Sequence, residues 1–192
     1  MAVYYGELEL DAHENVYAPA EDSFLLADNL GEFKGCVLDM GTGTGIQALT
    51  AAKRAEHVVG VDVNPEAVEL ARRNAESNDI DNADFMVSNL FSNVEGRFDL
   101  IIFNPPYLAA EDAGELGKAW SGGTTGVEVI NRFIEEAGEY LTPEGRIMLL
   151  VSSINRLGKV KEKLADCGYD VEITAKEKIF FEELYVLSAF KR

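Results

Sequence analysis

The chain has 192 residues, 47% of them hydrophobic, which is enough for one well-packed domain and too little for two. Its net charge of −17 argues against direct binding of DNA or RNA, whose affinity depends largely on Lys and Arg. No run approaches the ~20 apolar residues of a membrane helix, and the N-terminus has no signal-peptide pattern.

These observations predict a single cytoplasmic domain that does not bind a membrane. Only two histidines and two cysteines are present, without metal-ligand spacing, so we expect no metal site. Three explanations of the acidity stay open: a solvated surface for a salty cytoplasm, a basic protein substrate, or a partner that supplies positive charge.

Short apolar runs alternate with helical stretches along the chain. After a helix expected within 18–30, buried strands are predicted for CVLDM (36–40), HVVGVDV (57–63), DFMVS (84–88), DLIIF (99–103) and RIMLLVS (146–152). Helical spacing is seen over 45–55, 65–78, 127–141 and 156–168. In the second of these helices Asn64 is a suitable cap and Pro65 a suitable first residue. The alternation predicts a parallel sheet with crossover helices on both faces.

Two further strand-like runs close the chain and are joined by only a few residues around 176–181. A parallel connection needs a dozen residues or more, so these two strands should pair antiparallel.

A glycine-rich turn follows the first of the predicted strands. Asp39 ends that strand, and Ile46 occupies the place of the third glycine in a dinucleotide-binding fingerprint; the turn contains Gly41, Gly43 and Gly45. Glycines here let the backbone approach a ligand closely at a helix N-terminus. Asp62 ends the next strand and is suited to accept both hydroxyls of a ribose.

This combination resembles the class I S-adenosyl-L-methionine (SAM)-dependent methyltransferases, over nearly the whole chain. The resemblance implies a Rossmann-like α/β fold whose seven-stranded sheet has the order 3-2-1-4-5-7-6, with strand 7 antiparallel. It also implies SAM as cofactor and S-adenosyl-L-homocysteine as product. The cofactor contacts that it implies are Asp39 and Gly41 for the methionine part, Asp62 for the ribose, and Asn89 and Leu90 for the adenine. Gly43 is predicted as a further cofactor-binding residue of the turn. The family usually has Asp where this chain has Asn89, whose amide oxygen can still accept a hydrogen bond.

The fourth strand runs directly into Asn104-Pro105-Pro106-Tyr107. The NH2 of an amide or a nucleobase is a poor nucleophile because its lone pair is delocalised. Two acceptors that hold its hydrogens would aim the lone pair at the methyl donor and favour the cationic nitrogen of the transition state. The Asn104 side-chain oxygen and the Pro105 carbonyl suit this task, Pro106 stiffens them, and Tyr107 offers a stacking face. We therefore predict these four residues to be catalytic, with Asn104 and Tyr107 binding the substrate.

Together with VYAPAEDSFLL (16–26), this motif resembles the HemK-type glutamine N5-methyltransferases, specifically their short archaeal and eukaryotic branch. That branch usually has Glu where this chain has Ala18. The resemblance implies that Ser23 contacts the cofactor and that residues 17–22 close over the pocket. It divides residues 1–192, one methyltransferase domain, into an N-terminal cover segment and helix (1–33) and a Rossmann-like core (34–192).

The same resemblance implies a substrate and a partner. Proteins of this branch methylate the glutamine of the Gly-Gly-Gln motif in class-1 translation release factors, usually as a heterodimer with a small zinc-binding activator. In the expected sheet order the strand 84–88 is an edge, so we expect the activator to add a strand there.

Other readings of the sequence stay open. An N6-adenine or N2-guanine methyltransferase would use the same alignment of an NH2 group, but it also needs a basic track for nucleic acid. A protein lysine methyltransferase and a non-catalytic scaffold subunit are further alternatives. The loop 108–126, with Trp120, is either a lid that orders on substrate binding or a plain surface loop.

Overall fold

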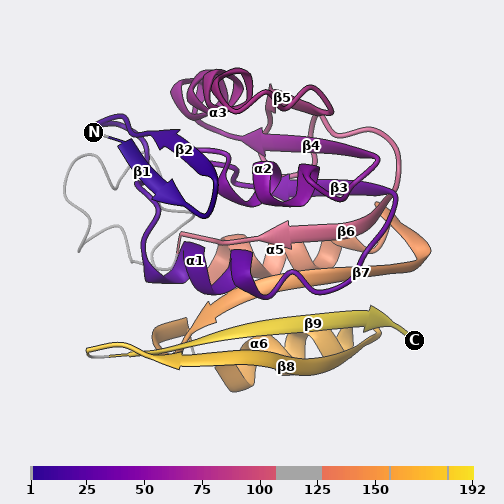
Figure 1. The fold of residues 1–192 in the computed structure, drawn as a ribbon. Helices are drawn as coiled ribbons and strands as arrows, with labels where there is room; N and C mark the ends of the chain where they lie inside the picture. Colours follow the sequence, from indigo (N-terminus) through magenta and orange to yellow (C-terminus); the bar gives the residue numbers. More distant parts are fainter. Residues whose placement is uncertain (1, 107–126, 156, 181) are drawn as a thin grey trace.

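The computed structural model describes residues 2–106, 127–155, 157–180 and 182–192, which form a central sheet between two layers of helices (Figure 1). The sheet contains β3 (Cys36–Met40), β4 (His57–Asp62), β5 (Ala83–Val87), β6 (Phe98–Phe103), β7 (Leu141–Ser152), β8 (Tyr169–Lys178) and β9 (Glu183–Lys191). The helices are α1 (Glu21–Asp28), α2 (Ile46–Ala52), α3 (Pro65–Ser77), α5 (Val127–Ala137) and α6 (Leu157–Asp166), and a short 3-10 turn spans Ser153–Asn155. Ahead of them lies a hairpin of β1 (Ala2–Tyr5) and β2 (Leu8–Asp11).

The strand order of the sheet is β5-β4-β3-β6-β7-β9-β8. Counted from β3, this is 3-2-1-4-5-7-6. The last strand, β9, is antiparallel to both of its neighbours, whereas all other pairs are parallel. The predicted fold class, including the terminal antiparallel hairpin, is confirmed.

Two local features differ from the sequence prediction. The hairpin β1–β2 was not expected, and β7 begins at Leu141 rather than at 146, inside the stretch predicted as the end of a helix. Leu141 is fully buried and pairs with Phe98, whereas the next pair along the two strands is Leu100 with Arg146. The residues between form a bulge, which is why strand periodicity is visible in the sequence only after it.

The sheet has a separate hydrophobic core on each face, and β6 shows how one strand serves both. Leu100 and Ile102 belong to the core shared with α1, α2 and α3, while Ile101 and Phe103 belong to the core shared with α5 and α6. All four side chains are buried. Such a strand has no polar face, which is why its sequence is continuously apolar.

The carboxyl ends of the parallel strands meet at one edge of the sheet, on the left in Figure 1. We refer to this as the catalytic edge. At β3 and β6, which are neighbours, the chain winds away in opposite directions. Ligands of open α/β sheets bind at such a switch point. The hairpin β1–β2 lies at the same edge, beside α3.

Candidate active site

The glycine turn begins with Asp39, at the end of β3. The side chain is 1% exposed, and its Oδ2 accepts hydrogen bonds from the Thr42 hydroxyl (2.7 Å) and the Ala48 backbone N–H (3.1 Å). Burial raises the pKa of Asp39 to about 7, although both hydrogen bonds act in the opposite direction. The carboxyl group thus braces the turn against the first residues of α2.

Asp62, at the end of β4, also forms a hydrogen bond with this turn. Its Oδ2 accepts from the backbone N–H of Gly43 at 3.0 Å, and its Oδ1 accepts from that of Asn64 at 2.9 Å. Burial raises its pKa above the usual value for an aspartate. Asn64, and not Asp62, caps α3, because its side-chain oxygen accepts from the Glu66 N–H. Asp62 is therefore held in one orientation at the carboxyl end of β4.

Asn104 follows β6 directly. The NH2 group of its side-chain amide has a hydrogen-bond partner, whereas the amide oxygen has none among the described residues. The Nδ2 atom donates to Asp22 Oδ2 (3.1 Å) and lies 3.4 Å from the Ser23 hydroxyl. Because a carboxylate can only accept, this contact fixes which end of the amide is the NH2. The Oδ1 atom is buried, and no donor among the described residues pairs with it. A buried acceptor without a partner costs about 1–3 kcal/mol, so its presence indicates a place for a ligand donor.

Asp22 holds the first turn of α1 together at this point. Its Oδ1 accepts from the Ser23 N–H (2.6 Å) and from the Tyr17 hydroxyl (3.2 Å). Gln47 on α2 donates through Nε2 to the Ser23 carbonyl at 2.8 Å, while its own Oε1 is buried with no donor among the described residues. The sequence prediction placed Ser23 here and counted Asp22 in the segment that closes over the pocket, but it gave no role to Gln47 and did not predict the contact of Asp22 with Asn104. A buried acidic residue in the first turn of a covering helix was the available signal for Asp22.

The glycine turn and Asn104 face each other, as expected from the switch point. A Cβ atom built on Gly41 would lie 3.5 Å from the Phe103 ring and 3.9 Å from the Asn104 carbonyl oxygen. Gly41 also has a φ of +68°, which favours glycine. Gly41 thus lies beside the end of β6, next to Asn104.

The residues after β5 form the far end of this edge. Leu90 is buried and has a φ of +50°, while Asn89 is exposed and donates its N–H to the Ser92 hydroxyl (3.1 Å). Two exposed apolar side chains that the sequence prediction did not select, Val63 after β4 and Val87 at the end of β5, lie at the same edge. They provide an apolar surface beside Asp62 that suits a planar base.

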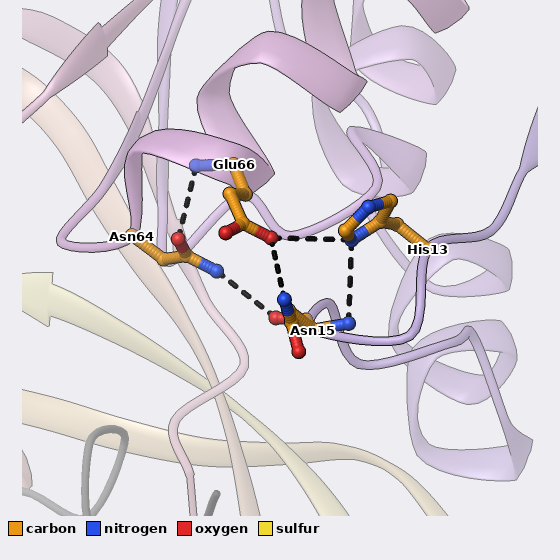
Figure 2. Close-up of polar contacts among 4 residues, drawn as sticks. All are labelled: His13, Asn15, Asn64 and Glu66. Carbon is orange, nitrogen blue, oxygen red and sulfur yellow. Dashed lines mark hydrogen bonds and ion pairs between the residues drawn. The ribbon is translucent and has the colours of Figure 1, made fainter.

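The segment that leads into α1 is tied to the start of α3 (Figure 2). Asn64 donates to the Asn15 carbonyl (3.0 Å), and Asn15 donates to Glu66 Oε2 (2.9 Å), which also lies 3.3 Å from His13 Nδ1. Val16 packs against α3 in the same region. The segment before α1 is therefore fixed to the helix that follows Asp62.

Part of the predicted motif can be placed and part cannot. Pro105 is buried and Pro106 is exposed. Tyr107, together with Trp120 and the loop predicted as a lid or a surface loop, lies outside the described residues, so those predictions stay predictions. No helix within the described ranges is long and apolar enough to cross a membrane.

Comparison with known proteins agrees with this geometry. The family model for the methyltransferase small domain matches residues 7–181. The chain belongs to this methyltransferase family. A protein of Methanocaldococcus jannaschii that is assigned by name to the protein N5-glutamine methyltransferases is 43% identical over the whole of both chains. Methyltransferase HEMK2 of Homo sapiens is 32% identical, with 98% of this chain and 95% of that protein covered.

A solved structure shares the fold and the family. It is that of Mtq2 from E. cuniculi in complex with Trm112, described as responsible for methylation of the translation termination factor eRF1. It is 31% identical to this methyltransferase with a TM-score of 0.75, and the match covers 93% of this chain and 99% of that chain. The resemblance to HemK-type enzymes is thereby confirmed, and the protein is a SAM-dependent methyltransferase.

The residues of the catalytic edge fit this cofactor. Its sulfonium is cationic, and two buried carboxyl groups, Asp39 and Asp62, lie at the glycine turn. A Cβ on Gly43 would meet nothing closer than 4.0 Å, so the turn leaves room on this side. The buried Gln47 Oε1 adds an acceptor that has no donor in the described part of the chain.

Proposed function

We propose that this methyltransferase transfers a methyl group to the N5 nitrogen of a glutamine side chain, in the Gly-Gly-Gln motif of a class-1 translation release factor. The observation that carries the proposal is the Asn104 amide. Its NH2 end is held by Asp22, and its Oδ1 is buried without a donor in the described structure. The names of the relatives support the same substrate.

In this proposal the chain contributes alignment rather than acid–base chemistry. SAM supplies an activated methyl group on a positively charged sulfur. Asn104 Oδ1 and the Pro105 carbonyl accept the two hydrogens of the glutamine NH2, which directs the nitrogen lone pair toward that methyl. Both acceptors also stabilise the positive charge that grows on the nitrogen during transfer. Pro106 limits their movement, and Tyr107 is proposed to stack on the planar amide.

We assign the cofactor roles on the same basis. Asp39, Gly41 and Gly43 would line the methionine part, Asp62 would accept from the ribose hydroxyls, and Asn89 and Leu90 would border the adenine beside Val63. Ser23 would contact the cofactor next to Asn104. Residues 1–192 would act as one cytoplasmic domain in which 1–33 cover a core of 34–192.

We further propose that a small zinc-binding activator protein adds a strand to β5. This strand is an edge of the sheet. The backbone groups of even-numbered residues bond to β4, as shown by the Asn82 carbonyl and the Ser88 N–H, so the backbone N–H and C=O groups of the odd-numbered residues point away from the sheet. On the outward side, Arg72 donates to the Phe85 carbonyl (2.8 Å) and Asn93 to the Val87 carbonyl (2.9 Å). These side chains would move aside for a partner strand. The opposite edge, β8, contains a bulge and two lysines, features that discourage pairing.

A labelling experiment tests the function. The protein, with and without the activator, is incubated with methyl-labelled SAM and with release factors that contain Gly-Gly-Gln or Gly-Gly-Ala. We expect label only on the Gly-Gly-Gln protein, and mass spectrometry should place it on the glutamine side chain. Label on the Gly-Gly-Ala protein, on a lysine, or on tRNA in a parallel reaction would overturn the proposal.

The variant Asn104→Ala tests the residue. Transfer should fall by at least 100-fold, since the variant lacks the acceptor, while the Kd for SAM measured by calorimetry should change little. Asn29→Ala is a matched control, because its amide is also a hydrogen-bond donor, to the Leu25 carbonyl, but it lies at the end of α1 far from Asp22. Loss of SAM affinity in the Asn104 variant would instead make Asn104 a cofactor ligand.

A further inference from the structure

The exposed apolar side chains of this protein are concentrated at the catalytic edge. Within the described ranges, the large hydrophobic side chains that are exposed are Tyr4, Tyr17, Val63, Val87, Ile154, Ile173 and Phe180. Six of the seven lie at the catalytic edge, Tyr4 among them as part of the hairpin β1–β2; Ile173, in the middle of β8, is the exception. Isolated exposed apolar residues need no explanation, but a concentration at one edge indicates binding.

Four of these residues lie on two sides of Asn104. Val63 and Val87, at the ends of β4 and β5, adjoin the glycine turn and belong with the proposed cofactor site. Ile154 follows β7, and Phe180 lies in the turn between β8 and β9, on the other side of β6. The cofactor site therefore does not account for Ile154 (56% exposed) or Phe180 (98% exposed).

Hydrogen bonds hold the backbone segments that carry these two side chains. The Ser152 hydroxyl donates to Glu182, and it accepts from the Ile154 N–H at 3.2 Å. The Glu183 N–H donates to the Ser153 hydroxyl (3.1 Å), which joins the 3-10 turn to the start of β9. The Ile179 N–H donates to the Glu182 carbonyl (3.0 Å) and closes the turn that carries Phe180. Contacts of this kind lower the entropy that an exposed side chain loses on binding.

The position of this surface relative to Asn104 follows from the register. Phe103 of β6 pairs with Leu149 of β7, so Ser152 lies beyond the level of Asn104 by about 7 Å, at about 3.3 Å per residue. The turn of β8–β9 continues in the same direction, since Leu184 pairs with Ser152. It is displaced sideways from β6 by two strand spacings, or about 10 Å. A folded protein that presents a side chain to Asn104 can therefore contact this surface, whereas a five-residue peptide centred on that side chain does not reach it.

We propose that Ile154 and Phe180 form the docking surface for the protein substrate, and that they contact an apolar patch next to the loop that carries its glutamine. This inference rests on the proposed function and adds how the enzyme would distinguish a folded release factor from a peptide. The net charge of −17 opposes a nucleic acid as the occupant of this surface.

The test compares two substrates for each variant, with the activator present. One substrate is the release factor, and the other is a five-residue peptide centred on the glutamine, which reaches only about 7 Å to either side. Phe180→Ala should raise the KM for the release factor roughly tenfold, and Ile154→Ala should raise it by a smaller factor. The peptide kcat/KM should change less than twofold. Ile173→Ala is the matched control, because it truncates an exposed side chain in the middle of β8. It should leave the kinetic constants for both substrates unchanged.

The outcomes separate the two proposals. If the wild-type protein methylates neither substrate, the proposed function fails. If it methylates both and Phe180→Ala leaves the KM for the release factor unchanged, only the docking surface is overturned. The same conclusion follows if Phe180→Ala weakens binding of the activator, measured by calorimetry, in place of binding of the release factor.

Discussion

The Asn104 amide depends on a carboxylate that the chain supplies from 82 residues away. Asp22 is 2% exposed, and its two oxygens hold Asn104, Ser23 and Tyr17 at once. If Asn104 were free to rotate its amide, the NH2 end would face the substrate half of the time, where it would repel another NH2 group. Asp22 is thus a positioning residue, which acts on the substrate only through Asn104.

Asp22→Ala should lower kcat by roughly 10- to 100-fold, because it removes the hydrogen bond that orients Asn104. A hydrogen bond to a charged group contributes about 1.5–3 kcal/mol. The KM for the glutamine substrate should rise less, because the backbone acceptor at Pro105 is retained. Steady-state kinetics with the release factor measures both. Asp28→Ala, at the exposed end of the same helix, is the control. A kcat equal to that of the wild type would remove Asp22 from the catalytic arrangement.

Asp39 makes the stability of the cofactor-free protein dependent on pH. Burial raises its pKa from 3.8 to about 7, so the folded state binds this proton more tightly than the unfolded state. Its stabilising contribution is complete below pH 4 and is lost as the pH rises through 7. Asp39→Asn keeps an acceptor for Thr42 and Ala48 but does not titrate.

Urea unfolding of wild type and Asp39→Asn at pH 4.5 and pH 8 measures this contribution. The variant should gain free energy of unfolding relative to the wild type at the higher pH, by about 4 kcal/mol at most for a shift of this size. Asp81→Asn, at an exposed position, should show no such change. A difference between wild type and Asp39→Asn that stays constant with pH would mean that Asp39 is ionised over the whole range.

At the level of elements, the N-terminal hairpin is bound by asparagines of α3 as if by another strand. Asn74 accepts from the Asp11 N–H (2.9 Å) and donates to the carbonyls of Asp11 and Thr44. Four residues on, one helical turn away, Asn78 accepts from the Glu9 N–H (3.0 Å) and donates to its carbonyl. Two helix side chains thus satisfy the outer edge of β2 and hold the segment that continues into the cover of the active site.

Asn74→Ala should destabilise the protein by about 2–4 kcal/mol, because it removes three hydrogen bonds at a side chain that is 1% exposed. Asn78→Ala, at a half-buried position, should cost about 1 kcal/mol. Urea unfolding gives both values. In hydrogen exchange the Asp11 amide should lose protection in the first variant and the Glu9 amide in the second. Equal, small effects of the two substitutions would show that the hairpin is held by its apolar contacts alone.

The contrast between the sheet and this hairpin shows what the sequence could predict. The parallel sheet followed from buried apolar runs with helices between them, and the antiparallel end from the short link before β9; the strand order itself came from the resemblance to class I methyltransferases. The N-terminal hairpin was not predicted. Its strand β2 alternates over only four residues, and the outer edge of β2 bonds to two asparagine side chains rather than to a further strand. The contact between Asp22 and Asn104 was missed for a related reason: the two residues are 82 positions apart, and the sequence near Asp22 does not indicate which group it meets. The glycine turn, Asp62 and Asn104 could be predicted as site residues because each lies at or directly after the end of a strand.

At the level of the whole molecule, the acidity has a testable meaning. The net charge of −17 is carried by a protein whose proposed substrate presents its Gly-Gly-Gln loop to ribosomal RNA, so we expect that part of the substrate to be basic. Opposite charges on enzyme and substrate accelerate encounter, and the effect weakens as salt screens them. A surface that is acidic only to stay hydrated in concentrated salt would show the opposite trend.

The kcat/KM for the release factor should therefore fall, by roughly tenfold, between 50 and 500 mM KCl, because the association rate falls. The value for an uncharged five-residue glutamine peptide should change less than twofold over the same range, since it has no charge for the enzyme to attract. If both substrates react at constant or rising rates and the melting temperature of the enzyme climbs steeply with KCl, the acidity is an adaptation to salt. If the release factor alone slows, the charge serves recognition, and its steering would deliver the substrate to the apolar contact at Ile154 and Phe180.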